Sequence, residues 1–126
     1  MLRVFLLYLA AFWGGIGAVL LVRPELLAGY AGVSADGAVA TAELRAMYGG
    51  LELAIAAVTA AACWRPAWQR PVLFMQVVVC AGIGAGRLLG LAVDGAAAAY
   101  TFGALAFELT TVVIALVFLR RLGEEC

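Results

Sequence analysis

The sequence predicts an all-α integral membrane protein, an antiparallel four-helix bundle that forms a single domain over residues 1–126. Composition is the first observation: 67% of the residues are hydrophobic and 13% are charged. Soluble domains carry about 45–50% apolar and about 25% charged residues. The second observation is four separate apolar runs, each close to the length of about 20 residues that crosses a bilayer. Backbone that faces lipid must satisfy its own hydrogen bonds, so these runs are expected to be helices.

The expected spans cover residues 4–22, 40–63, 72–93 and 97–119. The first span ends at the Arg-Pro-Glu sequence of residues 23–25. Because proline suits the first position of a helix, Pro24 is expected to start a short interfacial helix over residues 24–31. Clusters of polar residues, proline and glycine predict turns between the helices. These turns are expected at residues 34–37, 65–71 and 94–95.

The distribution of arginine predicts the orientation in the membrane. All eight basic residues are arginine. One side of the expected bundle carries Arg3, Arg65, Arg70, Arg120 and Arg121, whereas the loops of the other side carry only Arg23. Basic residues favour the cytoplasmic side. We therefore expect a multi-pass protein of the bacterial cytoplasmic (inner) membrane, with both termini in the cytoplasm.

Several classes of function find no support in the composition. The net charge is zero, which gives no reason to expect nucleic acid as a partner. The chain has no histidine, and its three cysteines (Cys63, Cys80 and Cys126) do not form a CxxC pair. We therefore expect no metal site and no cofactor.

The glycine-rich stretch at residues 77–90 has a superficial likeness to a dinucleotide-binding turn. Gly82, Gly84 and Gly86 form GxGxG, whereas the dinucleotide motif is GxGxxG within a βαβ unit. Small residues four positions apart favour close packing of membrane helices. The stretch therefore predicts a packing ridge of Gly82, Gly86 and Gly90. Other glycines are expected to serve helix packing in the same way: Gly14, Gly15, Gly17, Gly49 and Gly50.

Ionisable residues inside the spans are the candidates for function, because such residues are rare, costly and usually face the bundle interior. Arg45, Tyr48 and Glu52 are spaced i, i+3 and i+7, so they are expected to lie on one face of a helix. Several unpaired charges would oppose insertion into the membrane, so these charges are expected to pair. Glu52 and Glu108 are expected near the midplane, with Arg45 and Arg87 toward the outer face. The sequence thus predicts one polar cavity that opens to the outer leaflet. Its expected ligand-binding residues are Glu43, Arg45, Tyr48, Glu52, Arg87, Asp94 and Glu108.

Besides a small transporter or proton-coupled carrier, for which four spans are few unless a dimer supplies eight, three kinds of function are compatible with such a cavity. The first is binding of a lipid-like or amphipathic ligand, or of a partner helix. The second is an intramembrane acid/base enzyme, an isomerase or cyclase of an isoprenoid-like substrate, with Glu52 and Glu108 as catalytic candidates. The third is a structural or accessory subunit in which the charges fix the helix register. Membrane lipid is the expected partner, and the sequence leaves open whether a homodimer or another membrane protein is also involved.

Several short motifs together resemble an uncharacterised bacterial family of small four-span membrane proteins, a domain of unknown function. The motifs are Arg-Pro-Glu at 23–25, E-x-R-x-x-Y-G-G at 43–50, G-R-x-x-G at 86–90, Asp-Gly at 94–95 and Glu108. The resemblance covers nearly the whole chain. It implies the four-span architecture and the importance of these positions, and it implies no activity.

Overall fold

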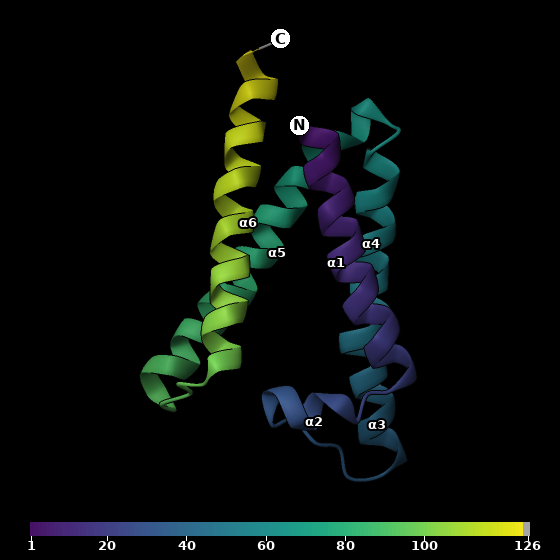
Figure 1. Cartoon of the computed structure of the whole chain (residues 1–126), viewed down its shortest axis with the longest axis vertical. Coiled ribbons are helices and arrows are strands. Elements are labelled where there is room, and N and C mark those ends of the chain that lie inside the picture. The colour runs from purple at the N-terminus through teal and green to yellow at the C-terminus, as the bar shows by residue number, and fades with distance from the viewer. Residues whose placement is uncertain (125–126) are drawn as a thin grey trace. The chain divides into compact units, whose positions relative to one another are not determined.

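The computed structural model describes residues 1–124, and all regular secondary structure in this part of the chain is helical (Figure 1). The elements are α1 (Leu2–Val22), α2 (Leu26–Ala31), α3 (Ala38–Leu44), the π-helical turn η1 (Arg45–Gly50), α4 (Leu51–Ala62), α5 (Pro66–Val93) and α6 (Ala99–Glu124). Four helical stretches are long and apolar enough to cross a membrane: Leu2–Val22, Ala38–Ala62, Pro66–Val93 and Ala99–Gly123. The predicted all-α fold with four membrane-length helices is confirmed.

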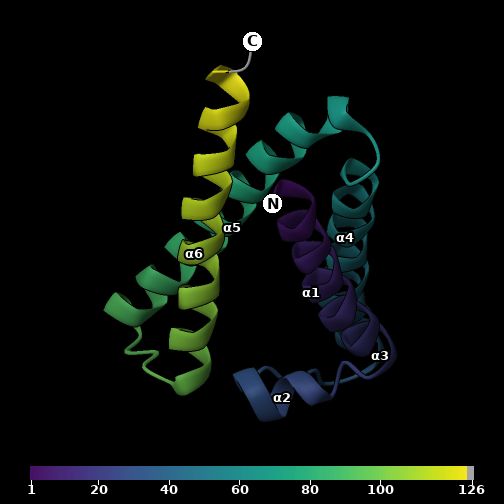
Figure 2. The same ribbon diagram turned by 45° about the horizontal axis from the view of Figure 1, so that its top comes forward.

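The helices belong to two compact units, residues 1–66 and the residues from 67 onward. In the first unit α1 packs against η1 and α4, which run in the opposite direction (Figures 1 and 2). The buried residues of α1 recur every three or four positions, as expected for one face of a helix: Leu6, Leu9, Trp13, Gly17 and Leu20. The prediction that residues 1–126 form a single domain stays a prediction.

The second unit is a helical hairpin of α5 and α6. Its turn is the predicted one: Gly95 adopts a left-handed backbone conformation with φ +65°, which glycine reaches without steric cost. The backbone N–H groups of Asp94 and Ala96 both donate to the carbonyl of Gly90. Leu105 and Glu108 of α6 lie next to Gly84 of α5. The buried residues of α6 follow a helical spacing: Thr101, Leu105, Glu108, Thr111 and Ala115.

The turn predicted at residues 65–71 is wrong, because α5 begins at Pro66 and not at residue 72. The break between α4 and α5 is therefore limited to residues 63–65. Proline is favoured at the first helical position, where its missing N–H would have no partner in any case. Pro71 lies inside α5, close enough to the start of the helix that it removes a single early hydrogen bond.

The expected interfacial helix over residues 24–31 is present as α2, two residues shorter at its start. Gly32 ends this helix in the left-handed region with φ +69°. Gly37, with φ +91°, immediately precedes α3. Both glycines occupy backbone conformations that other residues rarely adopt, which explains their place in the loop between α2 and α3.

Candidate functional site

An ion pair lies inside the second unit. Nε of Arg87 on α5 donates a hydrogen bond of 2.8 Å to Oε1 of Glu108 on α6. The Glu108 side chain is only 5% exposed, whereas that of Arg87 is 26% exposed. The guanidinium carbon of Arg87 also lies 5.2 Å from the centre of the Tyr100 ring, a geometry that favours the cation. The expectation that charges within the spans would pair is confirmed for Arg87 and Glu108.

The second carboxylate oxygen of Glu108 has a different environment. Oε2 is buried and accepts no hydrogen bond from the described residues. A β carbon on Gly84 of α5 would lie 3.3 Å from this oxygen, so the absence of a side chain at Gly84 lets the carboxylate approach the α5 backbone. A buried acceptor without a donor costs about 1–3 kcal/mol. The site therefore has unused capacity to accept a hydrogen bond.

The glycine of α5 that faces α6 is Gly84. The three glycines of the predicted packing ridge, Gly82, Gly86 and Gly90, do not face α6. Within the described residues, β carbons on Gly82 or Gly86 would meet no atom within 4 Å, and one on Gly90 would approach only the nearby turn. The reason is helical phase: Gly84 continues the buried positions Leu73, Gln76 and Cys80 of α5, whereas residues two positions away point about 200° from it. Gly82 and Gly86 thus have no packing role in this unit.

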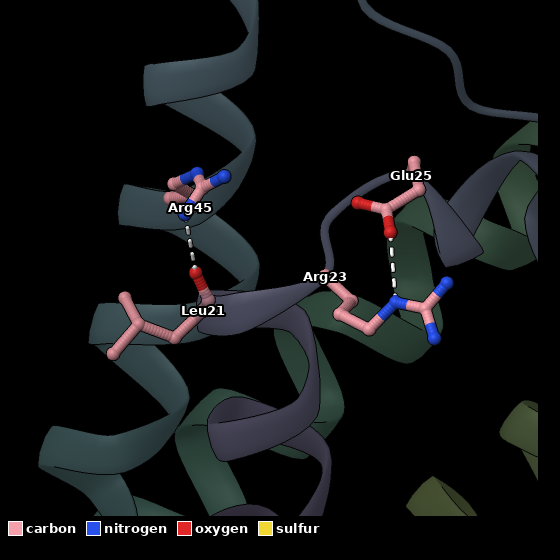
Figure 3. Close-up of polar contacts among 4 residues, drawn as sticks. All are labelled: Leu21, Arg23, Glu25 and Arg45. Carbon is pink, nitrogen blue, oxygen red and sulfur yellow. Dashed lines mark hydrogen bonds and ion pairs between the residues drawn. The ribbon is translucent and has the colours of Figure 1, made fainter.

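Arg45 in the first unit has a backbone partner. Its Nη1 donates a hydrogen bond of 3.0 Å to the carbonyl oxygen of Leu21, in the last turn of α1 (Figure 3). The last four carbonyls of an α-helix lack partners within the helix, and a positive charge is favourable at this end of the helix dipole. Arg45 therefore caps the C-terminal end of α1. Figure 3 also shows the neighbouring exposed ion pair, in which Arg23 Nε lies 2.9 Å from Glu25 Oε1.

The segment after Arg45 is a π-helical turn. The backbone N–H of Leu51 donates to the carbonyl of Ala46, five residues earlier. A π turn contains one residue more than an α-helical turn. This extra residue rotates the part of the helix before the turn by about 100° relative to the part after it. The predicted common face of Arg45, Tyr48 and Glu52 assumed an uninterrupted α-helix, and this assumption is wrong through the π turn.

Close backbone packing accompanies the π turn. A β carbon on Gly49 would lie 2.7 Å from Cα of Leu21, and one on Gly17 would lie 2.9 Å from the carbonyl oxygen of Gly49. Real β carbons essentially never approach other atoms so closely. The prediction that Gly17 and Gly49 let the helices approach is confirmed. It is wrong for Gly15 and Gly50, where a β carbon would meet no described atom of a neighbouring helix within 4 Å. The π turn of α3–α4 therefore rests directly on the backbone of α1.

The other predicted site residues have varied environments. Glu43 and Asp94 are exposed, and Tyr48 is half-buried. Glu52 is half-buried with its Oε2 atom shielded from solvent, and its β carbon lies on the side of the helix that faces Gly17. These residues belong to separately described units, so the cavity lined by all seven predicted residues stays a prediction.

Two members of the Arg87–Glu108 site were absent from the predicted set, namely Tyr100 and Gly84. One signal for Gly84 was available in the sequence: residues 84 and 108 are each 12 positions from Ala96, in the turn of the hairpin. An antiparallel hairpin brings such positions to the same level. Tyr100 had no comparable signal, because its position over Arg87 depends on the side-chain conformation of the arginine.

Four membrane-length helices with an internal ion pair define a small multi-pass membrane protein. The chain belongs to a family described as a domain of unknown function, DUF4345, which it matches over residues 1–119. No match was found among curated proteins or among solved structures. The resemblance to an uncharacterised family is thereby confirmed.

Proposed function

We propose that this membrane protein binds a lipid-like, amphipathic ligand at the ionic centre, the group formed by Gly84, Arg87, Tyr100 and Glu108. The observation that carries the proposal is the buried Oε2 of Glu108, which accepts no hydrogen bond from the described residues although it belongs to an ion pair inside two apolar helices. Ionisable residues at such positions usually serve function. A ligand that donates to Oε2 would remove an unfavourable feature of the unliganded protein.

The exposure of the two charged side chains supports the proposal that the ligand head reaches the ionic centre from the side of Arg87. Its guanidinium retains 26% exposure, whereas Glu108 is nearly enclosed. Hydrogen bonds from a guanidinium to an oxygen acceptor are charge-assisted and therefore strong. An oxygen atom in the ligand head would thus contact Arg87 first and bring the head next to Glu108.

The surroundings of the ionic centre suit a hydrocarbon chain. Large apolar side chains are exposed on the stretches of α5 and α6 that carry its residues: Ile83, Leu88, Leu89, Phe102 and Leu109. Lipid tails are as apolar as these side chains, so burial of the ligand chain provides little net affinity within a bilayer. The chain would keep the ligand in the membrane, and selectivity would come from the polar head.

The arginine distribution supports a location in the bacterial cytoplasmic membrane with both termini in the cytoplasm. In that orientation the ionic centre is in the outer half of the membrane, because Arg87 precedes the end of α5 at Val93 by six residues, or about 9 Å. Reporter fusions test the orientation. Cytoplasmic reporters should be active at both termini, and activity of a periplasmic reporter at either one would contradict it.

Native mass spectrometry after gentle detergent extraction tests the binding proposal. Wild-type protein should retain an amphipathic adduct, and the double variant Arg87→Leu/Glu108→Leu should lose it. The double variant should remain folded, because replacing both partners of a buried ion pair with apolar residues is often neutral or stabilising. Arg45→Leu serves as the control that removes an arginine elsewhere and retains the adduct. An equal adduct on the double variant, or none on wild type, would contradict the proposal.

A further inference from the structure

We infer that the ionic centre selects a neutral head that carries a hydroxyl group, such as that of a long-chain alcohol, over an anionic head. This inference rests on the proposed function and specifies the chemical class of the ligand. Two properties of the site lead to it, its net charge and its hydrogen-bonding capacity, and the close contact of Gly84 with Glu108 provides a way to test it.

The charges of the site already balance. Arg87 from α5 and Glu108 from α6 are the charged residues of the ion pair, and no other charged residue in the described part of the second unit forms an ion pair with either of them. A phosphate or carboxylate head would place a second negative group beside the Glu108 carboxylate, with one guanidinium to compensate for both. Like charges in contact in an apolar environment repel strongly. A neutral head avoids this repulsion.

The hydrogen-bonding groups of the site differ in kind. An ionised carboxylate only accepts hydrogen bonds, and a guanidinium only donates them. The ligand must therefore donate to Oε2 of Glu108 and accept from Arg87. A hydroxyl group does both. A doubly ionised phosphate monoester or a carboxylate only accepts, so it would leave Oε2 without a donor, and an ammonium group only donates and would be repelled by Arg87.

Gly84 is the α5 residue that lies directly against Oε2 of Glu108, so a substitution there tests access to this oxygen. The position that a β carbon would occupy there is 3.3 Å from Oε2, 3.8 Å from Cβ of Glu108 and 4.0 Å from Cδ2 of Leu105. A methyl group at Gly84 would thus stand next to the oxygen and obstruct a donor. Gly82 and Gly86 are on the same helix, and β carbons on them would meet no described atom within 4 Å. They provide matched controls for a substitution at Gly84.

Binding of two probes with the same chain tests the inference: hexadecan-1-ol and hexadecyl phosphate. Dissociation constants for the purified full-length protein are measured by native mass spectrometry. Wild type should prefer the alcohol by at least about tenfold, because the phosphate leaves a buried acceptor without a donor. Glu108→Gln removes the negative charge and adds a donor, so it should reverse the preference toward the phosphate.

The glycine variants keep every charge and therefore report on the site even if Glu108→Gln does not fold. Gly84→Ala should weaken binding of the alcohol, and Gly82→Ala and Gly86→Ala should leave it unchanged. Equal effects of the three substitutions would overturn the assignment of the donor position.

The outcomes separate this inference from the proposed function. In one outcome wild type binds the phosphate as well as or better than the alcohol, and the Arg87→Leu/Glu108→Leu variant loses both probes. The selectivity for a neutral head would then be wrong, and binding at the ionic centre would still hold. If wild type and the double variant bind both probes equally, the proposed function fails and the inference fails with it.

Discussion

The two units of the protein each contain an arginine within a membrane-length helix, and they use it differently. Arg45 donates to the carbonyl of Leu21, where it caps a helix end next to a tight glycine contact. Arg87 instead pairs with the carboxylate of Glu108, and one oxygen of that carboxylate remains without a donor among the described residues. A charge within a membrane-length helix therefore does not by itself mark a binding site. The partner of the charge, and what that partner still lacks, decides its role.

The largest effect on the free energy of unfolding is expected when only one partner of the ion pair is removed. Arg87→Leu or Glu108→Leu alone should lower the free energy of unfolding by about 3–5 kcal/mol, because each leaves a buried charge without its partner. The double variant should be close to wild type for the reason given above. Unfolding in mixed detergent measures all three. A double variant that loses as much as the two single variants combined would show that the two charges act independently.

The second effect concerns the glycine contact of the first unit. Gly49→Ala should lower the free energy of unfolding by about 1–3 kcal/mol, since its methyl group would overlap the backbone of Leu21. Gly15→Ala is the control, because a β carbon there meets no described atom within 4 Å. Alanine in place of glycine within a helix should even stabilise it by about 0.5–1 kcal/mol. Equal stability of the two variants in the same unfolding assay would contradict the close contact.

Arg45→Leu should have a smaller effect, a loss of about 0.5–1.5 kcal/mol in the free energy of unfolding, because it removes one hydrogen bond at the end of α1. Ligand retention should not change. Detergent unfolding and native mass spectrometry on the same preparation give both quantities. Loss of the retained amphiphile in this variant would assign Arg45 to the binding site and remove the contrast between the two units.

The smallest effect is expected at the exposed pair of Arg23 and Glu25. The hydrogen bond from Arg23 lowers the pKa of the Glu25 carboxyl group below its ordinary value of 4.5. A lowered pKa means that the folded state binds fewer protons than the unfolded state near this pH. The contribution to stability is therefore present above pH 4.5 and is lost as the pH falls through the lowered pKa. Glu25→Gln should flatten this acid dependence slightly, and an unchanged pH profile of unfolding would contradict the pairing.

Much of the fold could be predicted from the sequence, because the bilayer imposes strong constraints on composition and length. Four spans, the short helix after Pro24 and the turn at Asp94 follow from apolar runs and from proline and glycine. The predicted start of the third span at residue 72 was wrong. Two prolines with Gln69 and Arg70 between them have the composition of a turn, although the backbone there is helical.

The candidate site was predictable only in part. That charges within the spans pair follows from the cost of unpaired charge in apolar helices, whereas the choice of Glu108 as the partner of Arg87 is seen only in the structure. The π turn at Arg45–Gly50 does not follow from periodicity, because it depends on the backbone contact of Gly49 with another helix. The role of Gly84 likewise depends on which face of α5 meets α6. Contacts between helices determine both the π turn and the role of Gly84. The pattern of residue types along a single helix does not predict these contacts.

Photolabelling of the full-length protein with a hexadecan-1-ol derivative that carries a diazirine near its hydroxyl group tests the central claim most directly. Labelled peptides are expected around Arg87 on α5 and between Tyr100 and Leu109 on α6, with labelling suppressed in the Arg87→Leu/Glu108→Leu variant. Labelling concentrated at residues 38–52, or spread evenly over all helices and unchanged in the double variant, would contradict it.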